Sequence, residues 1–182
     1  TIAEGEVLQL LNCKDPDVTE ARHMQVIDFK TAKLFEASCR LAGIVTGQNR
    51  DTIANLGRFG AEVGSAFQLI DDVLDYAGES AALGKNVGDD LREGKPTLPL
   101  IHAMQHSSGT VQAQIRDAIA NGGTQDVSAI MACIEETGSL AYTRNKAHAL
   151  AESAKRRLAH LPETPFRTAL DSLCDVSIQR TS

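Results

Sequence analysis

Residues 51–75 read DTIANLGRFGAEVGSAFQLIDDVLD, and apolar side chains recur among them at steps of three and four residues. This spacing places the apolar side chains on one face of an α-helix that begins near Asp51. They are Ile53, Leu56, Phe59, Val63, Phe67, Ile70 and Leu74. Gly57, Gly60 and Gly64 lie on or beside the same face. Because each glycine inside a helix costs about 1 kcal/mol relative to alanine, we expect another helix to approach the backbone closely there.

Helical periodicity continues along the rest of the chain, and no stretch shows the two-residue alternation of a half-buried strand. In the first half of the chain, helices are expected from residue 2 to about 12 and from residue 17 or 19 to about 43. In the second half, one helix is expected after Pro96, and shorter ones follow up to residue 121 and from about 125 to 136. The last two are expected from 139 to 160 and from Pro165 onward. Residues 78–94 form the least regular stretch, which is rich in glycine and charged side chains. The sequence therefore predicts an all-α fold with a single helical domain over residues 1–182.

The composition excludes several classes of protein. The 182 residues carry a formal net charge of −6, which disfavours nucleic acid and anionic membranes as general partners. No apolar run approaches the roughly 18 residues that a transmembrane helix needs, and no signal peptide is visible. The cysteines are widely spaced, and we interpret them as reduced thiols of a cytoplasmic protein rather than as a zinc site. They are Cys13, Cys39, Cys133 and Cys174.

Three carboxylates and an amide share one stripe near the end of the helix that begins near Asp51. Asp71 and Asp75 lie about 40° apart around the helix axis, and Asp72 and Gln68 fall on the same side. Carboxylates this close repel one another, so a cation is expected among them. Mg²⁺ suits the pattern because it binds oxygen ligands, takes one or two carboxylates, and completes its coordination with water and substrate phosphate. The alternative is a solvated acidic helix face, which is the common fate of charge clusters.

A glycine-rich stretch follows, and residues 84–96 read GKNVGDDLREGKP. Lys85 and Lys95 flank a second pair of aspartates, Asp89 and Asp90. Such a loop fits a metal-bridged diphosphate, because carboxylates hold the metal and ammonium groups neutralise the remaining phosphate charge. The spacing excludes an EF-hand, and the motif of a P-loop is absent.

The segment from Phe67 to Leu100 resembles the second aspartate-rich region of the trans-polyprenyl diphosphate synthases. Gly5-Glu6-x-x-Gln9 and Lys30-Thr31-Ala32 also match this family in order and approximate spacing, so the resemblance covers nearly the whole chain. It implies an isoprenoid-synthase-type helical bundle around an apolar cavity, Mg²⁺ as cofactor, and a homodimer. The implied reaction is condensation of an allylic diphosphate with isopentenyl diphosphate, giving a long-chain all-trans polyprenyl diphosphate for quinone side chains.

The resemblance also assigns roles to individual residues. The metal ligands would be Asp71 and Asp72, with Asp75 completing the site partly through water, and Asp90 would steady the lysine-bearing loop. The implied catalytic residues are Asp71, Asp72, Lys30 and Lys85, and the implied diphosphate-binding residues are Lys30, Thr31, Gln68, Lys85 and Lys95.

Other polar residues receive simpler interpretations. Glu6 and Gln9 are expected only to organise helix packing near the site. The histidines are interpreted as ordinary core or surface residues, and no metal-ligand partner is expected near His23; the others are His102, His106, His148 and His160. Asp171 and Asp175 lack a third carboxylate and an adjacent basic loop, and they are interpreted as surface residues.

The chain departs from the family pattern at its beginning. No first DDxxD motif precedes Gly5, and the basic cluster with which the family binds isopentenyl diphosphate is missing. We therefore expect the C-terminal portion of a synthase, without the N-terminal helices, with only the second aspartate-rich half of the site and with apolar faces left exposed. One alternative is a non-catalytic partner subunit of a synthase, and a weaker one is a terpene cyclase or head-to-head condensing enzyme.

Overall fold

The computed structural model describes residues 1–77, 88–122 and 127–180, and every element within these ranges is helical. The prediction of an all-α fold is therefore confirmed. The elements are α1 (Ile2–Asn12), α2 (Glu20–Ile27), η1 (Asp28–Ala32), α3 (Lys33–Val45), α4 (Arg50–Leu74), α5 (Asp89–Arg92), α6 (Leu98–His106), α7 (Gly109–Asn121), α8 (Val127–Glu136), α9 (Ser139–Arg157) and α10 (Pro165–Ile178). Among the described residues, no helix combines the length and the apolar character that a membrane crossing requires.

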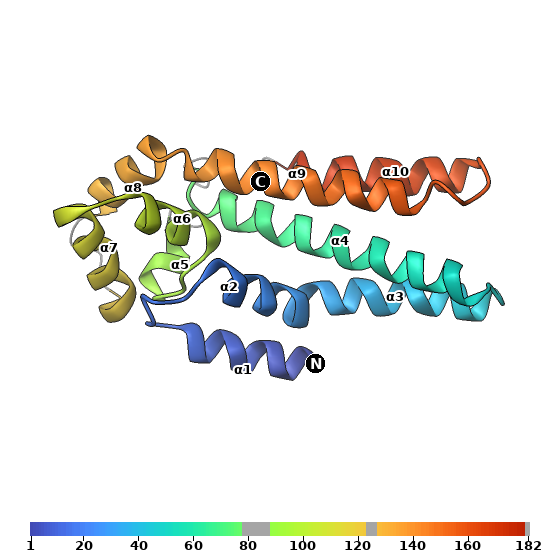
Figure 1. Ribbon diagram of the computed structural model, residues 1–182, viewed down its shortest axis with the longest axis horizontal. Coiled ribbons are helices and arrows are strands. Elements are labelled where there is room, and N and C mark those ends of the chain that lie inside the picture. Colours follow the sequence, from blue (N-terminus) through green and yellow to red (C-terminus); the bar gives the residue numbers. More distant parts are fainter. Residues whose placement is uncertain (78–87, 123–126, 181–182) are drawn as a thin grey trace.

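Helix α4 is the central helix of the bundle. Figure 1 shows α9 and α10 along one side of α4, and α2 and α3 along the other. The start of α4 is fixed by Asn49, whose Oδ1 accepts a hydrogen bond from the backbone N–H of Thr52 at 2.9 Å. Its apolar face is buried in one core with α9, and this core includes Phe59, Val63, Leu69, Ile70, Ala147, Ala151 and Ala154.

The glycines of α4 are sites of close helix packing, as the sequence predicts. A Cβ atom on Gly64 would lie 2.9 Å from the Cα atom of Ala32, and one on Gly60 would collide with the backbone carbonyl of Phe35. Because real Cβ atoms do not approach other atoms this closely, only glycine allows α4 to lie against η1 and α3 at this distance. The packing places the end of α4 directly beside η1.

The helix expected from residue 17 or 19 to 43 is interrupted in its middle. Thr19 caps α2, since its Oγ1 accepts the N–H of Arg22 at 3.3 Å. Between α2 and α3, η1 is a π-helical turn, and it contains Lys30 and Thr31. The prediction of one continuous α-helix is therefore wrong at these residues. Such wide turns occur frequently at functional sites because they change where side chains point.

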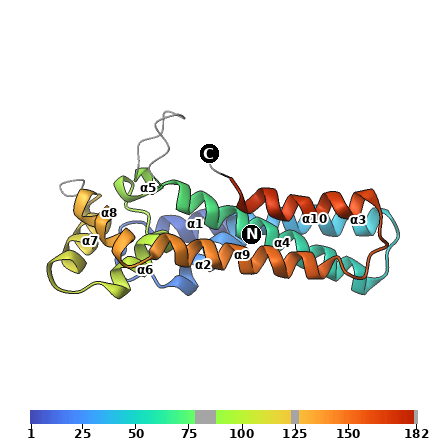
Figure 2. The same ribbon diagram turned by 90° about the horizontal axis from the view of Figure 1, so that it is seen from above.

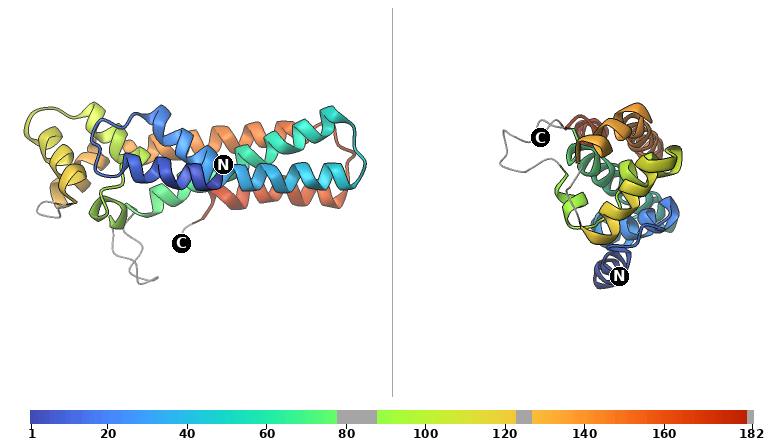
Figure 3. Two further views of the ribbon diagram at one scale, coloured as in Figure 1. Left: turned by 90° about the horizontal axis from the view of Figure 1, so that it is seen from below. Right: turned by 90° about the vertical axis from the view of Figure 1, so that its left-hand side faces the viewer.

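Helix α1 lies against η1 through a glycine. A Cβ atom on Gly5 would lie 2.5 Å from the backbone nitrogen of Lys30 and 2.8 Å from its Cα atom. The two backbones are therefore in direct contact, and side chains of α1 next to Gly5 can reach Lys30. Figure 3 shows α1 at the edge of the bundle in its end-on view.

A second apolar cluster lies at one end of the molecule, where α5, α6, α7 and α8 gather (Figure 2). It contains Tyr76, Leu91, Leu100, Ile115, Ile119, Ile130 and Ile134. The chain passes from the first cluster to the second through the end of α4. The acidic residues at this end of α4 therefore lie where the two clusters meet.

Large apolar side chains remain exposed on α1 and α3. Leu10 is 72% exposed and Val45 is 83% exposed. The others on these helices are Ile2, Val7, Leu11, Leu34, Leu41 and Ile44. This agrees with the expectation of uncovered apolar faces.

Candidate functional site

The three carboxylates of the first acidic motif lie at the C-terminal end of α4. Asp71 and Asp72 lie in its last turn, and Asp75 is the residue that caps it. Their environments differ, since Asp72 is 2% exposed and the Asp71 side chain is 45% exposed. The C-terminal end of a helix already carries partial negative charge. Three carboxylates at this end therefore need positive charge or hydrogen-bond donors close by.

Asp72 receives a hydrogen bond at each of its two oxygens. His23 of α2 places Nε2 2.8 Å from Asp72 Oδ2, and Gln68 Nε2 donates to Asp72 Oδ1 at 3.1 Å. Gln68 Oε1 in turn accepts a hydrogen bond from Thr31 Oγ1 at 3.1 Å. The predicted residues Thr31, Gln68 and Asp72 thus form one connected network.

Lys30 is held by Glu6 and Gln9, two polar residues of α1. Its Nζ donates to Gln9 Oε1 at 2.6 Å and lies 3.3 Å from Glu6 Oε1. The close approach of Gly5 to the backbone of Lys30 makes these contacts possible. Glu6 and Gln9 therefore do more than organise helix packing, because they contact a predicted site residue directly.

Helix α5 contributes the second acidic motif, Asp89 and Asp90, and the segment after it contributes Lys95. The backbone N–H of Asp90 donates to Asp75 Oδ2 at 3.1 Å, and Lys95 Nζ lies 3.6 Å from Asp90 Oδ1 and pairs with Glu93. Burial and the neighbouring carboxylates of Asp75 and Asp72 together raise the pKa of Asp90 to about 7, against the opposing effect of Lys95. Asp90 thus contacts Lys95. Lys85 lies outside the described residues.

These residues surround one cavity of about 210 Å³. Its lining includes both carboxylates of the Asp71–Asp72 pair and two lysines, whereas Asp75 is not part of the lining. The full set is Gln9, His23, Val26, Ile27, Lys30, Thr31, Gln68, Asp71, Asp72, Asp90, Lys95 and Thr97. The predicted residues within the described ranges, apart from Asp75, therefore converge on a single space.

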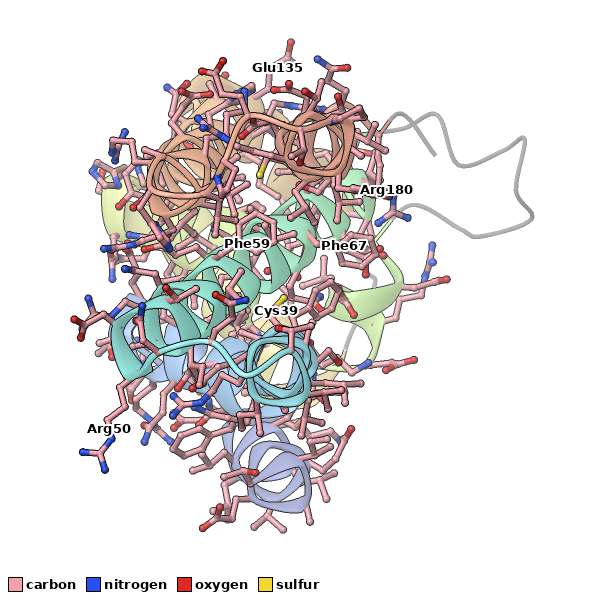
Figure 4. All side chains as sticks on the ribbon, turned by 90° about the vertical axis from the view of Figure 1, so that its right-hand side faces the viewer. Cys39, Arg50, Phe59, Phe67, Glu135 and Arg180 are labelled. Carbon is pink, nitrogen blue, oxygen red and sulfur yellow. The ribbon has the colours of Figure 1, made fainter. Side chains whose placement is uncertain are left out.

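Arg180, from the end of the chain, lies beside the acidic pair. Its guanidinium carbon is 4.4 Å from the ring centre of Phe67, and its Nη1 is 3.9 Å from Asp71 Oδ1. Figure 4 shows Arg180 next to Phe67 in a view along the bundle. A cation over an aromatic ring is stabilised by the negative charge of the ring face, so Arg180 keeps a positive charge close to Asp71.

The residues present fit a hydrated Mg²⁺ ion. Within the described ranges, no group of three or more His, Cys, Asp or Glu side chains is arranged to hold a metal alone. Mg²⁺ does not require such a cage, because it keeps several water molecules and binds through one or two carboxylates together with substrate phosphate. The exposed carboxylate of Asp71 faces the cavity with oxygen ligands of the kind that Mg²⁺ prefers.

His23 and Arg180 are the site residues that sequence analysis missed. His23 is a core residue, 8% exposed, and its side chain also lies within hydrogen-bond distance of Asp72, which the sequence analysis did not anticipate. It precedes Asp72 by 49 residues, so only the packing of α2 against α4 brings them together. The available signal was a polar side chain at a buried helical position.

Comparison with known proteins identifies the family. The sequence pattern of the polyprenyl synthetase family matches residues 1–137. The chain belongs to this family. The resemblance drawn from the aspartate and lysine motifs is thereby confirmed.

Relatives in this family include synthases of long prenyl chains. The chain is 48% identical to octaprenyl diphosphate synthase of Escherichia coli (strain K12) over 180 residues, which cover 98% of this chain and 56% of the relative. It is 45% identical to the all-trans-nonaprenyl-diphosphate synthase (geranyl-diphosphate specific) of Rhodobacter capsulatus, over 98% of this chain and 55% of that protein. The chain thus spans about half the length of the curated relatives it matches.

Solved structures of polyprenyl synthetases share the fold. A polyprenyl synthase from Caulobacter crescentus CB15, complexed with calcium and isoprenyl diphosphate, has a TM-score of 0.92 at 37% identity, covering 100% of this chain and 56% of its own. A geranylgeranyl pyrophosphate synthase from Corynebacterium glutamicum, complexed with isoprenyl diphosphate and magnesium, has a TM-score of 0.87 at 28% identity, covering 98% of this chain and 52% of its own. The predicted isoprenoid-synthase-type bundle is therefore confirmed over about half the length of these proteins.

Proposed function

We propose that this chain carries the second aspartate-rich half of the active site of a Mg²⁺-dependent trans-polyprenyl diphosphate synthase. The observation that carries the proposal is the convergence of Asp71, Asp72, Lys30 and Lys95 on one cavity. Carboxylates and ammonium groups around one space are what a metal-bound diphosphate requires. The divalent metals and isoprenyl diphosphates named for two solved relatives support the same chemistry.

The roles of the residues follow from their positions around the cavity. Asp71 and Asp72 would hold Mg²⁺ on the diphosphate of the allylic substrate, with Asp75 contributing partly through water. Lys30 and Lys95 would bind diphosphate oxygens, and the Thr31–Gln68 pair would hydrogen-bond near the departing group. For Lys85, which lies outside the described residues, diphosphate binding rests on the family resemblance alone. When bound, Mg²⁺ neutralises charge on the diphosphate and makes it a better leaving group.

The proposed reaction is condensation of an allylic diphosphate with isopentenyl diphosphate. The carbon–oxygen bond of the allylic diphosphate breaks, a carbon–carbon bond forms to the double bond of isopentenyl diphosphate, and one proton and one diphosphate leave. The ammonium groups of Lys30 and Lys95 would stabilise the charge that develops on the departing diphosphate. The identities with octaprenyl and nonaprenyl synthases support a long-chain all-trans product for quinone side chains. A cytoplasmic homodimer rests on the family resemblance.

The test is a calorimetric titration of inorganic diphosphate into the chain, with and without Mg²⁺. We expect binding that requires Mg²⁺ and is lost in Asp71→Asn, because the metal loses a charged ligand. Asp51→Asn is the matched control, since Asp51 is an exposed aspartate at the opposite end of the same helix. Binding that ignores Mg²⁺, or that is equal in Asp71→Asn and the wild type, would contradict the proposal.

Condensation activity is tested separately with an allylic primer and labelled isopentenyl diphosphate. Formation of long-chain product supports the enzyme. Because the chain carries half of the proposed site, Mg²⁺-dependent diphosphate binding without any product still fits the proposal, and it favours the non-catalytic partner subunit when product is also absent after the N-terminal half of a relative is supplied.

A further inference from the structure

His23 contacts the most buried carboxylate of the proposed site. Nε2 of His23 lies 2.8 Å from Asp72 Oδ2, and both side chains are buried, with exposed fractions of 11% for His23 and 3% for Asp72. An ionised carboxylate only accepts hydrogen bonds, so Nε2 carries the proton that it donates. Bonds to a charged acceptor are stronger than neutral ones, and little water is present to compete with this one.

The hydrogen bond from His23 completes a clamp on Asp72. Gln68, on the same helix as Asp72, holds Oδ1 at 3.1 Å, whereas His23 reaches Oδ2 from α2. A carboxylate held at one oxygen can still rotate about its terminal torsion, which is broad. A second donor from a different helix fixes the plane of the carboxylate, and Asp72 still lines the cavity.

The surroundings of His23 argue against a role in packing alone. Its side chain borders the 210 Å³ cavity of the site and also a smaller cavity of about 20 Å³. A side chain kept only for packing would leave little empty space beside it. The imidazole is instead placed by its hydrogen bond.

We propose that His23 is a positioning residue that orients the Asp72 carboxylate for the metal–diphosphate complex. It acts through Asp72 and does not itself touch the diphosphate. The inference rests on the proposed function, because that function makes Asp72 a ligand of Mg²⁺. A metal ligand held in one orientation before binding loses less freedom on binding, and changes around metal ligands commonly alter affinity 10- to 100-fold.

The test compares two substitutions of His23 with one substitution of another histidine. Leucine at position 23 keeps the bulk and removes the donor, and glutamine restores an amide N–H close to the place of Nε2. The control is His102→Leu, because His102 makes a hydrogen bond of similar length, 2.9 Å to Ser139 Oγ, outside the site. Circular dichroism and thermal unfolding check that each variant is folded.

The first readout is the titration of diphosphate in the presence of Mg²⁺. We expect His23→Leu to weaken binding at least tenfold and to raise the Mg²⁺ concentration needed for half-saturation. We expect His23→Gln to stay within about threefold of the wild type and His102→Leu to match it. A packing role alone would predict no rescue by glutamine, so equal loss in His23→Gln and His23→Leu would overturn the inference.

The second readout is the protonation of the His23 ring, measured by long-range ¹H–¹⁵N NMR without any ligand. A proton on Nε2 is expected, and a ring protonated only on Nδ1 would overturn the inference. The titration also separates the two proposals. Mg²⁺-dependent binding in the wild type with unchanged affinity in His23→Leu would refute the role of His23 alone, whereas no binding in the wild type would refute the proposed function and the inference with it.

Discussion

Substitution of Gly5 by alanine tests whether the contact between α1 and η1 positions Lys30. The added Cβ atom would lie 2.5 Å from the Lys30 nitrogen, 2.8 Å from its Cα atom and 2.9 Å from its Cβ atom. Two of these atoms belong to the backbone, so no side-chain rotation relieves the collision. Ordinary contact begins at 3.4 Å, and the two helices must therefore separate by about 0.9 Å, the difference between 3.4 Å and 2.5 Å.

This separation has two measurable effects. Overpacking costs about 1–3 kcal/mol of stability, while alanine gains about 1 kcal/mol over glycine in a helix, so we expect a net loss of about 1 kcal/mol. The Lys30–Gln9 hydrogen bond of 2.6 Å would lengthen towards 3.5 Å, where it no longer holds the ammonium group. Because a misplacement of about 1 Å disturbs preorganised sites strongly, we expect roughly tenfold weaker Mg²⁺–diphosphate binding.

Calorimetric titration and thermal denaturation measure both effects, and Gly43→Ala is the matched control. At Gly43 the new Cβ atom would meet Ile53 Cγ1 at 3.0 Å and Leu56 Cδ1 at 3.2 Å, and these side-chain atoms need to give way by only a few tenths of an ångström. The control should therefore bind diphosphate as the wild type does. Wild-type affinity and an unchanged melting temperature in Gly5→Ala would refute the reasoning.

Three further outcomes are expected. Lys95→Ala should weaken diphosphate binding roughly tenfold in the titration, because the cavity loses an ammonium group, and an unchanged affinity would make Lys95 a surface residue. Thr31→Val should raise the dissociation constant several-fold, because Gln68 loses a hydrogen bond of about 0.5–1.5 kcal/mol, and a wild-type constant would remove Thr31 from the network. Burial raises the pKa of Glu20, but the hydrogen bonds from Lys146 and Tyr142 and the charge of Lys146 together outweigh burial, so the pKa lies below the ordinary value of 4.5. The stabilisation by Glu20 is thus complete above pH 4.5 and is lost as the pH falls through the lowered pKa. The melting temperature of Glu20→Gln should therefore lie below that of the wild type at pH 7 and equal it near pH 2. The same difference in melting temperature at both pH values would contradict this.

The helices were predictable because their signals are local. The apolar spacing that indicates a helix from Asp51 corresponds to α4, which begins one residue earlier at Arg50. The helix expected from Pro165 onward corresponds to α10, and Thr164 caps it by accepting the N–H of Arg167 at 3.2 Å. The close packing at the α4 glycines was predictable for the same reason, because the cost of glycine in a helix indicates a compensating contact.

The parts that sequence analysis missed depend on tertiary packing. The π-helical turn at Lys30 leaves the local pattern of residue types unchanged, so periodicity alone predicts an unbroken helix there. His23 meets Asp72 across 49 residues, and Arg180 reaches Asp71 from the end of the chain. Neither residue lies in a motif, and their roles follow only from which helix faces are brought together.

The same wide turn makes one residue of the chain dispensable to the bundle. A π-helical turn holds one residue more than an α-turn, so deleting a residue from η1 would turn it into ordinary helix and leave α2 and α3 collinear. The bundle would keep its fold, but the residues next to the deletion would rotate by about 100° around the helix axis relative to the helix on one side of it. Lys30 and Thr31 could then no longer both face the cavity. Deleting one residue here should therefore abolish the proposed diphosphate binding while the helical bundle still folds. Point substitutions in a packed core rarely separate these two effects.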